Sequence, residues 1–180
     1  MLNSKGSIGN TILVVMAIIV MVIFGFGVFF VIMYAFIARP FQVNGQAMNP
    51  TYTNGAYVLA QIGTEISRNN VVIYKSPKNP QIDLIKRVIA VPGDKIKLES
   101  GYIFINGQKL DESSYVMEEA RTFPGVFLRD GEELTVPEKS YFVMGDNRTM
   151  SSDSREWGYV LQGDIVGKVN FCYWSCGATK

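Results

Sequence analysis

A run of uncharged, mostly apolar residues from Ile12 to Ala38 limits what this chain can fold into. As a helix, these about 27 residues are about 40 Å long, which exceeds the ~30 Å hydrocarbon core of a bilayer. A cleavable signal sequence has a shorter apolar core and a small-residue cleavage site, whereas this run continues directly into Arg39 and Pro40. We therefore expect a retained transmembrane anchor at 12–38, preceded by a short tail at 1–11.

The charges that flank the anchor indicate its orientation. Lys5 and the amino terminus lie on one side and Arg39 on the other, and this small bias favours an amino end inside the cell. The expected arrangement is a single-pass protein of the plasma membrane, with the lipid bilayer as a partner. Residues 39–180 then form an extracytoplasmic domain that begins at the membrane surface.

Composition excludes several functions. The chain has 17 basic and 16 acidic residues, and the basic ones are scattered, so we expect no nucleic-acid partner. It has no histidine, which excludes serine/histidine and cysteine/histidine dyads and metal sites built on imidazole. We expect neither a metal nor another cofactor, and the residues give no indication of an oligomeric state.

After Arg39 the pattern is mainly β. Short runs rich in branched and aromatic residues, separated by turn residues, predict strands at 56–60, 71–74, 84–91, 95–98, 102–105 and 108–110. Asn106-Gly107 predicts a type I′ hairpin, because that turn needs positive φ at both central positions. Residues 111–133 are polar and irregular, and we interpret them as an insertion or flap. Nothing after residue 39 has a long helical period.

The only two cysteines, Cys172 and Cys176, lie close to the carboxyl terminus. They are too few for a disulfide framework or a complete zinc site. They are either two buried thiols or a pair that closes a short loop in an oxidising compartment, and their spacing alone leaves both possibilities open.

Lys86 is a candidate general base within the cluster 84–94. Strand alternation places it on one face with Leu84, Val88 and Ala90, so its ammonium group lies among apolar side chains. Desolvation lowers the pKa of a lysine towards the range in which it accepts a proton. The alternative is a structural lysine that reaches solvent from a sheet edge.

Two further clusters carry candidate groups. In 145–158, Asp153 and Arg155 are spaced to form an ion pair, and the Ser151 hydroxyl suits the orientation of a neutral lysine, although a well-bonded loop explains the same residues. In 41–51 the composition is that of a tight loop able to present backbone N–H groups. Ala47 at its centre has only a methyl group and cannot attack a carbonyl.

Taken in order, these clusters resemble those of the bacterial type I signal peptidases, which are serine/lysine proteases. The motifs are Ala47-Met-Asn-Pro-Thr51, where the family has serine first, then Lys86-Arg-Val with a following Pro-Gly-Asp94, then Gly145-Asp-Asn-Arg148 with Ser151-x-Asp-Ser-Arg155. The resemblance covers nearly the whole chain. It implies a single transmembrane helix followed by a mainly β catalytic domain.

The resemblance also implies roles. Residue 47 is the nucleophile position, Lys86 the general base and Ser151 the hydroxyl that orients it. Supporting positions are Asp146, Asn147, Arg148, Asp153, Ser154 and Arg155. An extended substrate lies along Phe41, Val43, Met48, Pro50, Asp83, Leu84 and Ile85. The implied function is removal of signal peptides from secreted preproteins, which are the expected partners.

Departures from the family pattern affect activity. With alanine at 47 the chain is expected to be inactive, either through a deliberate serine-to-alanine substitution or as a natural noncatalytic relative. Retention of the costly buried Lys86 favours the first explanation. Ala56 replaces a usual aspartate. A different class of function is an assembly factor that binds signal peptides or pilin-like substrates. A third possibility, a membrane-anchored adhesin, does not explain the three clusters.

Overall fold

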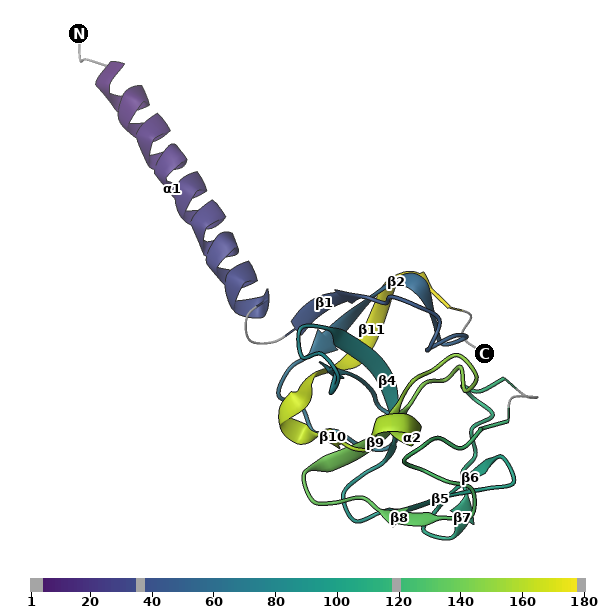
Figure 1. The fold of residues 1–180 in the computed structure, drawn as a ribbon. Helices are drawn as coiled ribbons and strands as arrows, with labels where there is room; N and C mark the ends of the chain where they lie inside the picture. Colours follow the sequence, from purple (N-terminus) through teal and green to yellow (C-terminus); the bar gives the residue numbers. More distant parts are fainter. Residues whose placement is uncertain (1–4, 35–37, 118–120, 178–180) are drawn as a thin grey trace. The chain divides into compact units, whose positions relative to one another are not determined.

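The structure is a computed structural model, and it describes residues 5–34, 38–117 and 121–177. The chain divides into two compact units, residues 1–38 and 39–180. The first is a long helix and the second is mostly β-sheet, as Figure 1 shows. This is the predicted fold class, an N-terminal apolar helix followed by a β-rich domain.

Helix α1 spans Lys5–Ile32, and its segment Gly9–Ile32 is long and apolar enough to cross a membrane. Helix α1 thus begins before the expected anchor at 12–38, and its apolar segment ends at Ile32. The helix begins in the polar stretch before Ile12, because backbone hydrogen bonding needs no apolar side chain. At the other end Ala38 already begins strand β1, and residues 35–37 of the expected span lie outside the described residues.

The larger sheet has seven strands in the order β1-β2-β11-β3-β4-β9-β10. The strands are β1 (Ala38–Gln42), β2 (Tyr52–Gln61), β3 (Val71–Lys75), β4 (Asp83–Ala90), β9 (Ser140–Met144), β10 (Val160–Leu161) and β11 (Ile165–Cys176). The long carboxyl-terminal β11 is inserted between β2 and β3, and it is drawn in yellow in Figure 1. The sheet therefore closes only when the end of the chain has paired.

The smaller sheet has four strands in the order β7-β6-β5-β8. They are β5 (Lys95–Glu99), β6 (Tyr102–Ile105), β7 (Gln108–Lys109) and β8 (Glu133–Thr135). Asn106 and Gly107 connect β6 to β7 with φ values of 53° and 79°, and Ile105 pairs with Gln108. The predicted two-residue hairpin is confirmed. The longest helix described after residue 39 is α2 (Ser154–Trp157), with four residues.

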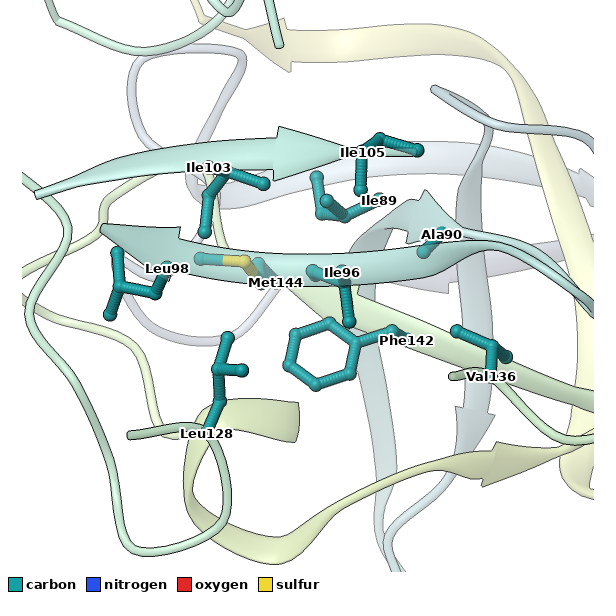
Figure 2. Packing of buried hydrophobic residues seen from close by; sticks show 10 residues of the cluster. All are labelled: Ile89, Ala90, Ile96, Leu98, Ile103, Ile105, Leu128, Val136, Phe142 and Met144. Carbon is teal, nitrogen blue, oxygen red and sulfur yellow. The ribbon is translucent and has the colours of Figure 1, made fainter. Parts of the chain in front are cut away.

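Apolar clusters hold the domain together. Figure 2 shows the one that joins the smaller sheet to β4 and β9, where Phe142 and Met144 meet Ile96 and Leu98. A second cluster is formed by Val43, Met48, Ala56, Val58, Ala60, Val71, Ile73 and Val169. Ala56, where an aspartate was expected, is fully buried in this second cluster. An uncharged side chain suits that position because an unpaired buried carboxylate is costly.

The described residues 111–117 and 121–133 pack against the domain, although they contain almost no regular structure. Tyr115, Val116 and Leu128 are buried, and Asp130 forms an isolated bridge with Leu98. The segment whose polar composition predicted an insertion or flap therefore has several buried contacts on either side of 118–120.

The two cysteines at the end of β11 are joined in a disulfide, Cys172–Cys176, with Cα atoms 5.9 Å apart. Of the two possibilities left open by the sequence, the structure has the pair. The register of β11 against β2 is irregular here, and Cys176 pairs with Tyr52. The Thr53 hydroxyl donates to the Ser175 carbonyl oxygen at 2.8 Å. The disulfide thus lies where the chain end meets the segment that follows Ala47.

Replacing both Cys172 and Cys176 with serine is expected to lower the free energy of unfolding of the oxidised domain by about 2 kcal/mol, because the short closed loop restricts the unfolded chain. Denaturant unfolding of the full chain in detergent measures the change. Reductant should produce the same loss in the cysteine-containing chain and none in the double variant. Equal midpoints with and without reductant would contradict the expectation.

Candidate active site

A groove of about 440 Å³ opens on one side of the larger sheet. Its lining comes from β1, the loop after it, β2, β3 and the first half of β4. The lining residues are Pro40, Phe41, Gln42, Val43, Asn44, Ala47, Met48, Val58, Ile73, Gln81, Ile82, Asp83, Leu84, Ile85 and Lys86. Ala47 and Lys86, which are 39 positions apart in the sequence (86 − 47), line the same groove.

Six of the seven predicted groove residues are in this lining; Pro50 is not. Pro50 follows a cis peptide bond and is half-buried behind the loop. The sequence analysis missed Val58 and Ile73, which belong to the cluster beneath the groove, and also Gln81 and Ile82 just before β4. Strand alternation marks Val58 and Ile73 as buried, but it does not indicate which cavity they line.

Ala47 lies in a loop that is tied down on both sides. Met48 beside it is fully buried, and the Tyr52 N–H donates to the Met48 carbonyl at 2.8 Å. Gly45 has φ +94° and its N–H donates to Asn54 Oδ1 at 2.8 Å. The carbonyl oxygen of Ala47 accepts the Asn147 N–H at 3.0 Å. Position 47 is therefore fixed to the loop that carries the Gly-Asp-Asn-Arg motif.

Lys86 is only 4 % exposed, although it carries an ammonium group. It pairs in register with Val72 on β3, and both neighbours after it on β4, Arg87 and Val88, are buried. Burial lowers the pKa of Lys86 below its ordinary value, a change that Asp153 opposes and Arg155 assists. The alternative of a lysine reaching solvent from a sheet edge is wrong for this residue, and the expected desolvation is present.

Ser151 lies beside the same loop. Its hydroxyl oxygen is buried and has no hydrogen-bond partner among the described residues. The Arg155 guanidinium donates to the Ser151 carbonyl at 3.1 Å. A buried hydroxyl without a partner is available to a group that enters the site, because leaving it unpaired costs free energy.

Asp153 and Arg155 form the predicted ion pair, with Arg155 Nε 2.8 Å from Asp153 Oδ1. Asp153 also caps α2 and accepts the Gly145 N–H at 3.0 Å. The Ser154 hydroxyl oxygen accepts the Val143 N–H at 3.0 Å. These three residues are buried and join α2 to β9 and to the loop at 145–148. None of the three is in the groove lining.

A second buried pair was not singled out from the sequence. Arg87 donates to both carboxylate oxygens of Asp146, at 2.8 and 2.6 Å. The Thr51 hydroxyl donates to Asp146 Oδ2 at 2.5 Å. Both Arg87 and Thr51 stand inside the quoted motifs, directly after Lys86 and Pro50, so their positions in those motifs were the available signal. Asp146 thus ties the strand of Lys86 to the loop of Ala47.

Gly145 lies next to both the Ala47 carbonyl group and the Ser151 side chain. A methyl group there would lie 2.5 Å from the Ala47 carbonyl oxygen and collide with the Ser151 hydroxyl. Gly145→Ala is expected to destabilise the domain by about 1–3 kcal/mol. Gly163→Ala is the matched control, because a methyl group there meets nothing within 4 Å. Thermal unfolding of the two variants measures the difference in stability. Equal stabilities would contradict the close contact of Gly145 with Ala47 and Ser151.

No group of three or more histidine, cysteine, aspartate or glutamate residues that could hold a metal ion occurs within 5–34, 38–117 and 121–177. The described site brings together a buried amine, a buried hydroxyl and backbone groups beside a groove. A groove bounded by β1 and β4 suits an extended polypeptide. The chain thus combines a long apolar helix α1 with a β-rich domain in which a buried amine lies beside such a groove.

Comparison with known proteins identifies the family. The family model described as signal peptidase, peptidase S26, matches residues 11–174. Signal peptidase IB of Staphylococcus aureus is 34% identical over 170 residues, covering 84% of this chain and 87% of that protein. Signal peptidase I of Bacillus caldolyticus is 35% identical over 150 residues, covering 77% and 81%.

A solved structure agrees with this result. The signal peptidase I of Enterococcus faecalis V583 superposes with a TM-score of 0.50 at 29% identity, covering 59% of this chain and 98% of that chain. The chain belongs to the signal peptidase family, peptidase S26. Members of this family are proteases that act on signal peptides, and the apolar α1 makes this one membrane-anchored.

Proposed function

We propose that this chain carries the serine/lysine site of a signal peptidase with its nucleophile position, residue 47, occupied by alanine, so that it binds signal peptides without cleaving them. The observation that carries the proposal is that Ala47 and the buried Lys86 line one groove. The groove residues are mostly apolar. This fits the extended, small-residue segment that precedes the cut in a secreted preprotein.

Free strand edges support an extended substrate. On β4, residues 83–86 pair with β3, whereas the described pairing with β9 begins only at Arg87. Backbone groups of Asp83 and Ile85 beside the groove can therefore bond to an added strand. Phe41 and Val43 line the groove from the side of β1 and the loop after it, so a bound chain would run between these two walls.

With serine at position 47, the site can hydrolyse a peptide bond through an acyl-enzyme. Neutral Lys86 takes the hydroxyl proton as the oxygen attacks the scissile carbonyl, and it then protonates the leaving amine. Lys86 next activates the water that hydrolyses the acyl-enzyme. Ser151 orients the amine, and backbone N–H groups near residue 47 hold the oxyanion. The methyl group of Ala47 can do none of this.

Two origins of Ala47 are compatible with the site. One is a deliberate substitution that traps substrate, and the other is a natural noncatalytic relative. The buried Lys86 supports the first, because a desolvated amine is costly to keep when no nucleophile needs it. We infer a catalytic ancestor or parent chain in either case.

We further infer that the domain lies outside the cytoplasm of a single-pass protein of the plasma membrane, with the lipid bilayer as its surroundings. Residue 47 follows Ile32, the last residue of the apolar span, by 15 positions (47 − 32), so the anchor and the site are joined by a short stretch of chain. Such tethering raises the effective concentration of the site and a signal peptide.

A second candidate is an assembly factor that uses the same groove to hold signal peptides or pilin-like substrates. The absence of a hydroxyl at residue 47 favours it. The two functions differ in their need for Lys86: Lys86→Ala should leave the cellular role of an assembly factor intact. Loss of that role would argue against the assembly factor.

Photo-crosslinking tests binding directly in the chain as it stands. A photoreactive phenylalanine at Ile82, which lines the groove, is expected to capture preprotein residues just before the cleavage site in lipid vesicles. The same group at Val126, an exposed residue outside the groove lining, is the control. Equal capture from both positions would count against the groove as the binding site.

A further inference from the structure

Three buried arginines lie outside the groove lining, and each of them contacts a described residue between 112 and 123. The Arg87 guanidinium carbon lies 4.2 Å from the centre of the Tyr115 ring. Arg155 donates to the Phe123 carbonyl at 3.2 Å. Arg148 donates to Glu112 and, at 2.8 Å, to the Thr122 hydroxyl. Described residues of this polar, irregular segment therefore contact all three arginine side chains.

Arg148 depends most strongly on this segment. Its side chain is completely buried, and Glu112 binds it through both carboxylate oxygens, one of them at 2.9 Å from Arg148 Nη1. Among the described residues, Glu112 is the only carboxylate that forms a salt bridge with Arg148. Burial opposes the charge of Arg148, but Glu112 raises its pKa above the ordinary value. A buried guanidinium needs such a partner to stay in place.

Arg148 in turn holds the loop that fixes residue 47. Its Nε donates to the Gly145 carbonyl at 3.1 Å, so the side chain closes the turn at 145–148 on itself. Within that turn the Asn147 N–H donates to the Ala47 carbonyl. A continuous set of contacts therefore runs from Glu112 through Arg148 and Asn147 to the nucleophile position.

We propose that Glu112 is a positioning residue of this site, which pairs with Arg148 and thereby holds the 145–148 loop against residue 47. The described residues 112–117 and 121–123 then serve as a brace for the site in place of the expected flap. The proposal deepens the proposed function and rests on it only for its kinetic consequence. Its structural consequence, the restraint on the Asn147 N–H, exists with or without catalysis.

The first test is hydrogen exchange in the chain as it stands. Glu112→Gln keeps the shape of the side chain and removes its charge, and Glu132→Gln makes the same change at an exposed residue. Exchange of the Asn147 amide is expected to become about 10-fold faster or more in Glu112→Gln alone, while that of the core amide of Ile73 is unchanged. Unchanged exchange at Asn147, or equal acceleration at Ile73, would overturn the proposal.

The second test uses the Ala47→Ser form. Glu112→Gln is expected to lower kcat by about 100-fold with KM unchanged, because small misplacement of the nucleophile loop affects the reaction more than binding. Glu112→Asp should recover part of the loss. If the Ala47→Ser enzyme is active and Glu112→Gln has the same kcat as Glu132→Gln, the proposal is overturned. If Ala47→Ser is inactive while Asn147 responds, the proposed function fails and the brace stands.

Discussion

Replacing Ala47 with serine is expected to turn a chain without turnover into an active endopeptidase. Loss of the nucleophile in a serine protease costs up to about 10⁶-fold in kcat, so a gain of that order is expected when the hydroxyl is restored. The site needs no other change, because Lys86 is already buried and residue 47 is already held by Asn147. A serine side chain adds one oxygen at a half-buried, groove-lining position.

The measurement is the initial rate of preprotein cleavage in detergent, with the alanine form purified in parallel as the control for contaminating proteases. A rate in the serine form that does not exceed that of the alanine form would mean that the groove binds without a working base. The assembly-factor function would then be the better account.

Lys86→Met in the Ala47→Ser protein is expected to reduce the rate by about 10²–10⁴-fold, the usual contribution of a general base. Methionine keeps most of the apolar volume of the lysine stem, so the buried position should remain filled. Lys95→Met is the matched control, because Lys95 is exposed and lies outside the groove lining. Equal loss in both variants, or full activity in Lys86→Met, would contradict the assignment.

The pH dependence of the serine form tests the same amine. Burial lowers the pKa of Lys86, so the neutral form that accepts the proton becomes common below the pH at which an exposed lysine ionises. The rate should therefore rise with pH through a midpoint below about 10.4, the ordinary lysine value. A flat profile across that range would indicate that no amine titrates in the reaction.

Local patterns predicted the parts of the fold that form between neighbouring residues. The β6–β7 hairpin follows from Asn106-Gly107, because the required backbone angles belong to those two residues. The burial of Lys86 was expected from strand alternation, but all residues from Lys86 to Ala90 on β4 are buried, so alternation does not explain it. In contrast, β11 was not predicted, since its pairing with β2 and β3 is long-range and irregular, and its end exposes Phe171, Tyr173 and Trp174.

The candidate site was predicted mainly from motifs, and its supports were predicted poorly. Asp153 and Arg155 are two residues apart, so their pairing could be expected from spacing. Arg148 and Glu112 are 36 residues apart, and no periodicity links them. The irregular composition of 111–133 resembles that of a free loop, although Tyr115 within it is buried against Arg87. Contacts of this kind depend on the tertiary fold.

The position of the cut made in a preprotein embedded in lipid vesicles tests the central claim most directly. Mass spectrometry of the product from the Ala47→Ser protein should show one new amino terminus, directly after small residues at the end of the signal peptide. The same product should be absent with Ala47 and with Lys86→Met. The same cut made by the alanine form, or no cut by the serine form, would contradict a serine/lysine site at residues 47 and 86.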